Sequence, residues 1–286
     1  MKKKIVSVLL CASLVATMVV GCGSKSSSDN DESSASSSSD AEKESFLDAN
    51  GDGVIEVGGG AVVSGFLQYN SEGDLEGYDY DVWQEIGKRT GYEINYNIME
   101  RDSMWPLLES GKLDSVGEQV SVTEERQEKY EFTEPYGYNY YCLLAAADNE
   151  ELQTMDDLKS GMTIACETNS SDEVIVKSVN EEYGIELQPT YFDGMSVEEV
   201  ALGRCDLWPR AETSCLITIQ EVDNLKILGR TKEIDISAYP FMKNDQGKAL
   251  CEVVTEAIKE MREDGTLTKL SEKWFDLDIS QKPTEE

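Results

Sequence analysis

Ser121-Val122-Thr123-Glu124-Glu125-Arg126, followed shortly by Phe132-Thr133-Glu134-Pro135-Tyr136, carries most of the fold assignment for this chain. Thr123 stands where an N-cap residue starts a short helix, because its hydroxyl can accept a hydrogen bond from a free backbone N–H of the first turn. Arg126 follows in that turn, where N–H groups and a guanidinium can converge on one anion. The stretch therefore predicts an anion-binding position at Arg126.

On both sides of this stretch, short apolar runs alternate with capped helical segments, a pattern typical of α/β folds with largely parallel sheets. Residues 92–98 alternate apolar and polar side chains and predict a strand with one buried face. Thr154, Ser170 and Ser196 each precede an acidic residue at capping-box spacing and predict helix starts. Residues 249–261 predict a long helix with one apolar face that belongs to the core.

Several motifs in order resemble the family 3 extracellular solute-binding proteins. Besides the two stretches quoted above, they are Gly77-Tyr78-Asp79-Tyr80-Asp81-Val82-Trp83, Met104-Trp105-Pro106-Leu107-Leu108-Glu109-Ser110-Gly111-Lys112-Leu113-Asp114, Leu202-Gly203-Arg204-Cys205-Asp206, and Asp264-Gly265-Thr266-Leu267 with Lys273-Trp274-Phe275. The resemblance covers about residues 53–280. It implies the periplasmic-binding-protein type II fold, an α/β fold of two lobes joined by two hinge strands, with a ligand cleft between them.

The resemblance also implies how the chain is divided. Lobe 1 is expected at residues 53–139 and 240–280, and lobe 2 at residues 142–237. Residues 140–146 and 236–242 are strand-like and lie where the family crosses between lobes, which is where closure would be absorbed. In this family, closure over a small ligand is what the membrane permease of an ABC transporter recognises.

Two site residues come from the opening stretch. In the family, the arginine at the position of Arg126 forks onto the α-carboxylate of the ligand, a task suited to a planar guanidinium with two parallel donors. The alternative is a surface arginine that pairs with Glu124 or Glu128. Ser121 corresponds to a family position that binds the ligand through its hydroxyl and its backbone.

Other ligand contacts are carried over from the same resemblance. In lobe 2, Asn169, Ser170 and Ser171 form a turn before a helix, and its N–H groups would close over the same carboxylate. The alternative is simply a capped helix. On the first loop of lobe 1, Phe66 and Tyr69 lie in a region that commonly supplies an aromatic wall.

The sequence departs from the family at positions that set specificity. Amino-acid binders usually carry an aspartate for the ligand ammonium where this chain has Ala211, and Glu212 could substitute only if the chain shifts register. Arg101 falls where the family often has an aromatic residue. Arg210 precedes Ala211, and Gln119 replaces a usual glycine.

Three arginines, Arg101, Arg126 and Arg210, predict a cleft whose local field is positive although the whole protein is acidic. An anionic or multiply polar ligand follows from that field. The alternative is that Arg101 and Arg210 point to solvent or pair with carboxylates such as Glu118 and Glu212. We predict a small carboxylate-bearing solute, either an amino acid or a derivative of one, and a dicarboxylate stays open.

The leading function is that of a substrate-binding lipoprotein of an ABC importer, a monomeric binding module with no cofactor and no catalysis. Its partners would be the carboxylate-bearing ligand and a membrane permease. Two other functions stay open. One is a lipid-anchored sensor subunit of a membrane receptor, and the other is a dehydratase-like enzyme on the same fold with Glu118, Glu167 or Glu212 as general acid.

Composition excludes several other classes. Of 286 residues, 57 are Asp or Glu and 25 are Lys or Arg, which gives a formal charge of −32. Such an acidic chain lacks the basic surface that nucleic-acid binding requires. The chain contains no histidine, which excludes His-based triads, imidazole bases and most zinc or non-haem iron sites.

Five cysteines lie beyond residue 100, and none forms a Cys-x-x-Cys pair: Cys142, Cys166, Cys205, Cys215 and Cys251. A bridge between Cys205 and Cys215 is possible, but the spacings indicate no disulfide framework and no metal site. We expect most of the five to be buried thiols that behave as small apolar residues.

The amino-terminal residues are typical of a targeting segment. Three lysines precede an apolar run that is shorter than the roughly 20 residues of a membrane-spanning helix. The run ends before Cys22 in a tetrapeptide that resembles a bacterial lipobox. We therefore predict a signal peptide at residues 1–21, lipidation of Cys22, a Ser- and acid-rich disordered tether at residues 22–45, and a location on the outer face of the cytoplasmic membrane.

Residues 48–55 match the start of an EF-hand loop, with oxygen ligands Asp48, Asn50 and Asp52. The twelfth position is Gly59, so the bidentate carboxylate that closes the coordination sphere is missing. We interpret the segment as an acidic turn that ends the tether, with weak calcium binding as the alternative.

Overall fold

The computed structural model describes residues 53–167, 172–193 and 196–283, all of which lie within one compact unit, Lys43–Glu286. Several predictions fall outside the described residues. They are the signal peptide, the tether, lipidation of Cys22, the EF-hand-like Asp48, Asn50 and Asp52, and the turn of Asn169, Ser170 and Ser171. Among the described residues, no helix is long and apolar enough to cross a membrane.

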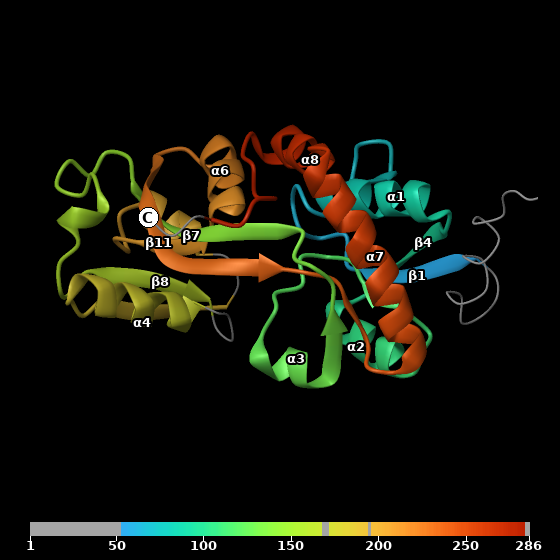
Figure 1. Ribbon diagram of the computed structural model, residues 1–286. Coiled ribbons are helices and arrows are strands. Elements are labelled where there is room, and N and C mark those ends of the chain that lie inside the picture. Colours follow the sequence, from blue (N-terminus) through green and yellow to red (C-terminus); the bar gives the residue numbers. More distant parts are fainter. Residues whose placement is uncertain (1–52, 168–171, 194–195, 284–286) are drawn as a thin grey trace, which may run out of the picture. The chain divides into compact units, whose positions relative to one another are not determined.

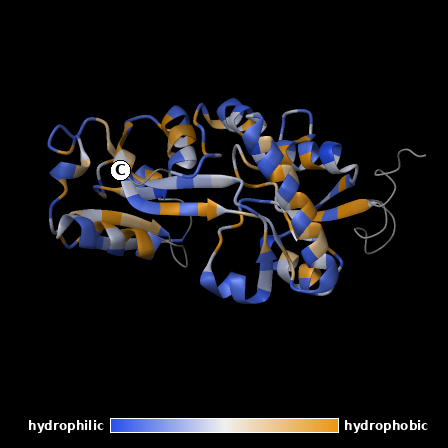
Figure 2. Ribbon diagram, in the orientation of Figure 1, coloured by the Kyte–Doolittle hydropathy of each residue, from blue (hydrophilic) through white to orange (hydrophobic). Residues whose placement is uncertain are grey.

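A parallel three-stranded sheet organises the first group of elements. Its order is β4-β1-β5, with β1 (Val54–Gly59) between β4 (Glu93–Ile98) and β5 (Ser115–Val116). β1 is apolar along most of its length (Figure 2), as expected for a parallel strand covered on both faces. The strand expected at residues 92–98 is confirmed as β4.

Helices cover this sheet from two sides. Ile55 and Val57 of β1 pack into a core with α1, α7 and α8, whereas the opposite side of β1 faces Met104 of α2. The buried side chains Leu250, Val254, Ala257, Ile258 and Met261 confirm the predicted apolar face of the long helix. The helices are α1 (Tyr78–Thr90), α2 (Arg101–Glu109), α7 (Asp245–Glu263) and α8 (Thr266–Phe275).

Two long strands leave this group side by side (Figure 1). β7 (Gly137–Ala146) pairs antiparallel with β11 (Leu225–Ser237) from Gly137↔Ser237 onward, and β10 (Trp208–Ala211) pairs with the other edge of β7. Close to them, β12 (Pro240–Met242) pairs antiparallel with β6 (Tyr130–Phe132). The segments expected to cross between lobes therefore lie in paired strands.

The second group of elements packs against β7, β10 and β11 through two apolar clusters. It contains the parallel pair β8 (Thr163–Glu167) and β9 (Gln188–Phe192), and the helices α4 (Asp172–Tyr183), α5 (Val197–Ala201) and α6 (Glu212–Glu221). The helix predicted after Thr154 is only one 3₁₀ turn, η1 (Met155–Asp157). Its capping box is formed, but Leu158 adopts an extended conformation and ends the helix at once.

The cysteines behave as expected. Cys142, Cys166, Cys205, Cys215 and Cys251 are all buried and free, which confirms the prediction of buried thiols. Cys205 and Cys215 form no bridge. Burial raises the pKa of Cys166 to about 12, so this thiol is protonated at neutral pH and acts as an apolar side chain.

Candidate ligand-binding site

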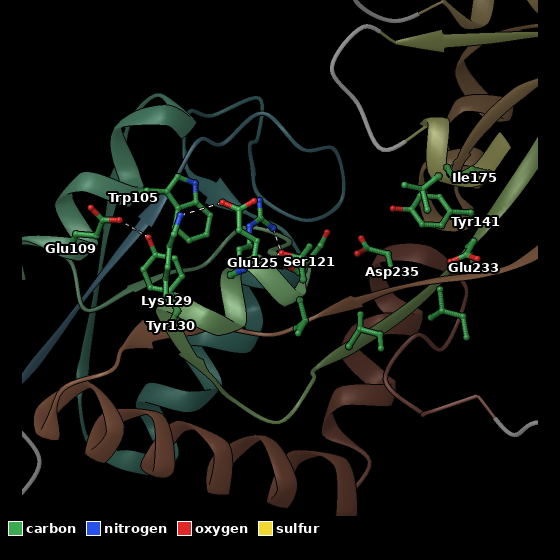
Figure 3. A pocket seen from close by; sticks show the side chains of 16 residues that line it. Trp105, Glu109, Ser121, Glu125, Lys129, Tyr130, Tyr141, Ile175, Glu233 and Asp235 are labelled. Carbon is green, nitrogen blue, oxygen red and sulfur yellow. Dashed lines mark hydrogen bonds and ion pairs between the residues drawn. The ribbon is translucent and has the colours of Figure 1, made fainter. Parts of the chain in front are cut away.

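A cavity of about 690 Å³ opens beside the stretch on which the sequence assignment rests (Figure 3). Its walls come from α2, the segment around α3 (Glu124–Lys129), β7, α4 and β11. This volume suits a small molecule. The lining side chains discussed below are Trp105, Glu109, Ser121, Glu125, Arg126, Lys129, Tyr130, Tyr141, Glu233 and Asp235.

The short helix α3 places Arg126 at the cavity. The Thr123 hydroxyl accepts a hydrogen bond from the Arg126 backbone N–H at 3.2 Å, which confirms the predicted N-cap. α3 is hydrophilic along its whole length (Figure 2) and buries none of its residues, so its cap and its flanking strand hold it in place. The guanidinium donates from Nη1 to the Ser121 carbonyl at 2.8 Å and lies 5.0 Å from the centre of the Trp105 ring.

The charge of Arg126 is only partly compensated. Its side chain is half-buried, and burial, followed by the charge of Arg101, lowers the pKa of Arg126. Asp235 and Glu125 oppose this effect. Within the part of the chain that the structure describes, Arg126 forms no ion pair, so the expected alternative of pairing with Glu124 or Glu128 is not observed. A carboxylate from outside the protein could therefore supply the missing counter-charge.

Ser121 is held between Arg126 and β11. Its backbone forms a bridge with Ser237, and the next residue, Val122, donates its N–H to the Ile236 carbonyl at 2.8 Å. The Ser121 carbonyl accepts from Arg126, and the Ser121 hydroxyl helps to lower the pKa of the neighbouring Asp235. Ser121 lies on the cavity wall, and its contact with a ligand stays a prediction.

Asp235 is a cavity residue that the sequence prediction missed. Its side chain is only 9% exposed, and burial raises its pKa, while the Ser121 hydroxyl and the charges of Arg126 and Arg101 lower it. In Figure 3, Asp235 lies between Ser121 on one side and Tyr141 on the other. The alternating pattern of β11 around Asp235 was the available signal, but the expected crossing segment begins one residue later, at 236.

Gln119 does not line the large cavity, and its role is to shape the backbone that leads to Ser121. It adopts a left-handed conformation with φ of 41° and donates its N–H to Asp79 Oδ2 at 2.9 Å. This conformation costs a non-glycine residue roughly 1 kcal/mol, which explains why glycine suits the position. Asp79 is fully buried, and Tyr239 donates its hydroxyl to Asp79 Oδ1 at 2.9 Å.

The buried Asp79 should give the protein a measurable pH dependence. Burial raises the pKa of Asp79 from 3.8 to about 6 despite its hydrogen bonds. The pKa of Asp79 is higher in the folded than in the unfolded state, so protonation of Asp79 favours the folded state. Its contribution to the free energy of unfolding is full below pH 3.8 and is lost as the pH rises through about 6. Lowering the pH from 7 to 4 should therefore stabilise the wild type relative to Asp79→Asn. Urea unfolding of both proteins across this range measures the difference, and parallel pH profiles would contradict it.

Two predicted site arginines are engaged elsewhere. Arg101, at the start of α2, is exposed and lies 3.8 Å from Glu118 Oε2, as in the alternative considered above. Arg210 lies 2.8 Å from both Asp172 Oδ1 and Glu167 Oε2, with its guanidinium 4.6 Å from the Trp208 ring centre. Neither lines the large cavity, although Arg101 borders a small pocket together with Arg126, so the structure does not bring the three predicted arginines together in one cavity.

The candidates for the ammonium partner also lie elsewhere. Glu212 begins α6, accepts from Arg230 Nε at 2.9 Å and borders a different cavity. Its predicted place in the ligand site is therefore corrected. Ala211 is buried and pairs in the sheet with Tyr141. No register shift of β10 brings Glu212 to the ligand cavity.

The predicted aromatic wall is corrected as well. Phe66 is buried in the core, with its ring 4.7 Å from that of Phe275. Tyr69 is exposed on a small hairpin, β2 (Gln68–Tyr69) with β3 (Leu75–Glu76), and lines none of the cavities described above. The cavity takes its aromatic surface from Trp105, Tyr130 and Tyr141 instead.

The three glutamates considered as general acids have structural partners. Glu118 accepts the Gly60 N–H at 2.8 Å and lies beside Arg101. Glu167 pairs with Arg210, and Glu212 with Arg230. None of the three lines the large cavity.

Comparison with known proteins identifies the family. Residues 56–277 match the bacterial extracellular solute-binding proteins, family 3. The chain belongs to this family. As a member of family 3, it is a binding protein and not an enzyme, and the general-acid hypothesis is withdrawn.

Individual relatives of this family 3 protein cover most of its length. The probable amino-acid-binding protein YxeM of Bacillus subtilis is 32% identical over 98% of this chain and 98% of its own. The putative amino-acid ABC transporter-binding protein PatH of Vibrio harveyi is 34% identical over 72% of this chain and 83% of its own. The structure of an ancestral arginine-binding protein bound to arginine is 29% identical, covers 78% of this chain and 98% of its own, and superposes with a TM-score of 0.61. The expected periplasmic-binding-protein type II fold is thereby confirmed.

Proposed function

We propose that this protein is the ligand-binding component of an ABC transporter for amino acids. The relatives YxeM and PatH are described as amino-acid-binding proteins, and PatH as part of an ABC transporter. The observation that carries the proposal is Arg126, a half-buried cation without an ion pair among the described residues, aimed at a cavity that fits a small molecule. Its two parallel donors suit the α-carboxylate of an amino acid.

The charges around the cavity favour a zwitterion over a dicarboxylate. Its lining has four carboxylates, Glu109, Glu125, Glu233 and Asp235, and two cations, Arg126 and Lys129. A second carboxylate on the ligand would meet this negative excess, whereas an ammonium group would offset part of it. The anionic ligand expected from three arginines is therefore replaced by an amino acid with a neutral or cationic side chain.

The remaining parts of the proposal concern delivery. Residues 53–139 with 240–280, and residues 142–237, would act as two lobes that close over the ligand, with β7 and β11 absorbing the change. Lipidation at Cys22, with residues 22–45 as tether, would keep the protein near the permease outside the cytoplasmic membrane. The extracellular character of the family supports this location.

A thermal-shift screen tests the ligand class. The full chain is heated with each of the twenty common amino acids and with succinate, glutarate and malate as dicarboxylates. A ligand at a hundred times its Kd stabilises the folded state by about 2.7 kcal/mol, which is easily measured. We expect at least one neutral or cationic amino acid to stabilise the protein. Stabilisation by the dicarboxylates alone would contradict the proposal.

A further inference from the structure

The further inference concerns the ammonium group of the ligand, and it rests on the proposed function. When Arg126 holds the carboxylate of an α-amino acid, the ammonium group two bonds away is carried into the same cavity. Burying a cation without a partner costs several kcal/mol, so a carboxylate of the protein must lie close to Arg126. The question is which of the four lining carboxylates fulfils this role.

Three of the four are poor candidates. Glu109 is exposed and accepts the Tyr130 hydroxyl at 2.9 Å, while Glu125 is exposed and pairs with Lys129 at 3.2 Å. Glu233 is only half-buried. Water competes strongly for an exposed carboxylate, so such groups contribute little to ligand affinity.

Asp235 differs in burial and in partners. It is only 9% exposed, yet within the described residues it forms no ion pair. A buried carboxylate normally has a cation or several donors around it. Burial raises the pKa of Asp235 because few groups around it stabilise its negative charge. A bound ammonium group would supply the missing positive charge.

Ser121 lies between Arg126 and the strand that carries Asp235. Its carbonyl accepts from Arg126 Nη1 at 2.8 Å, and Asp235 lies on its other side in Figure 3, so the two opposite charges line one cavity with Ser121 between them. The position is also firmly held, because the flanking Ile236 carbonyl accepts the Val122 N–H and Ser237 bridges to Ser121. A rigid pair of opposite charges is what recognition of an α-amino acid requires.

We propose that Asp235 of β11 binds the α-ammonium group of the ligand while Arg126 binds its α-carboxylate. The site then selects α-amino acids with a free ammonium group over carboxylic acids of the same shape that lack it. The residue that binds the ammonium group would then lie on β11, which pairs with one edge of β7. Ala211 on β10, which pairs with the other edge of β7, would have no part in this selection.

Matched ligand pairs test this assignment by titration calorimetry on the full chain. The probes are L-arginine against 5-guanidinopentanoic acid, and L-glutamine against 4-carbamoylbutanoic acid, which differ only in the α-ammonium group. We expect the wild type to prefer the amino acid. Asp235→Asn should weaken binding of the amino acid by about 30-fold or more, with little change for the analogue. Asp223→Asn, at an exposed carboxylate that does not line the cavity, should leave the preference unchanged.

Each other outcome has a distinct meaning. If Asp235→Asn keeps the wild-type preference, or weakens both members of a pair equally, Asp235 does not bind the ammonium group, and the proposed function stands. If the wild type prefers the analogues, the assignment is overturned as well. If the wild type binds neither member of either pair and no amino acid in the thermal-shift screen, the proposed function fails, and the assignment fails with it.

Discussion

Arg126→Ala should weaken binding of the best amino-acid ligand by about 30-fold to several thousand-fold. Truncating one partner of a buried, hydrogen-bonded charge pair costs on the order of 2 to 5 kcal/mol, and each 1.4 kcal/mol is about tenfold in Kd. Arg126 is half-buried against Trp105, so the ligand carboxylate would lose both a cation and two aligned donors. Titration calorimetry with the amino acid that most stabilises the wild type measures the loss.

Arg101→Ala is the matched control. It removes the same side chain from a position close to Arg126, but Arg101 does not line the large cavity, is exposed and, among the described residues, forms one ion pair, at 3.8 Å with Glu118. Exposed pairs contribute about 0 to 1 kcal/mol, so affinity should fall by less than about fivefold. The folded state of both variants is checked by their unfolding curves. Wild-type affinity in a folded Arg126→Ala protein would remove the central assignment.

Local features of the fold were predictable from the sequence because a few neighbouring residues decide them. Thr123 caps α3 through a backbone N–H three residues on, and the apolar face of α7 follows from helical spacing alone. The helix expected after Thr154 does not extend beyond one 3₁₀ turn. The capping box formed, but the chain turns into an extended conformation before a second helical turn.

The candidate site was predictable only where the sequence itself brings its parts together. Ser121 and Arg126 lie in one short stretch, so their joint position at the cavity follows from a single motif. The alternation around Asp235 indicates a strand, but the bridge that brings this strand to Ser121 joins residues far apart in the chain and is not visible in any local pattern. Tyr141 is likewise placed by β7.

The errors have the same physical origin. Phe66 is an aromatic residue of the type that contacts ligands, but its ring packs against Phe275, which lies far along the chain. Arg210 looks like a ligand-binding cation until Asp172 and Glu167 neutralise it. In both cases a side chain of suitable chemistry already has an internal partner from a distant segment, and residue type alone does not reveal that partner.

Arg210→Ala should therefore lower stability and leave ligand preference unchanged. The Arg210 side chain is 16% exposed, and its partner Asp172 is 4% exposed at 2.8 Å. Breaking a buried ion pair by removing one partner costs about 3 to 5 kcal/mol. Because Glu167 is more accessible than Asp172 and adds less, we expect about 3 kcal/mol in urea unfolding without ligand.

Arg204→Ala is the control for Arg210→Ala, because it removes an arginine from an exposed ion pair instead of a buried one. Arg204 pairs with Glu199 at 2.6 Å, but its side chain is 58% exposed, so its removal should cost less than about 1 kcal/mol. Both variants should rank the amino acids of the thermal-shift screen as the wild type does, because neither arginine lines the cavity. If Arg210→Ala instead changes that ranking and leaves the stability unchanged, the Arg210 guanidinium of the wild type must leave Asp172 and bind the ligand. The cavity beside Arg126 would then describe only part of the site.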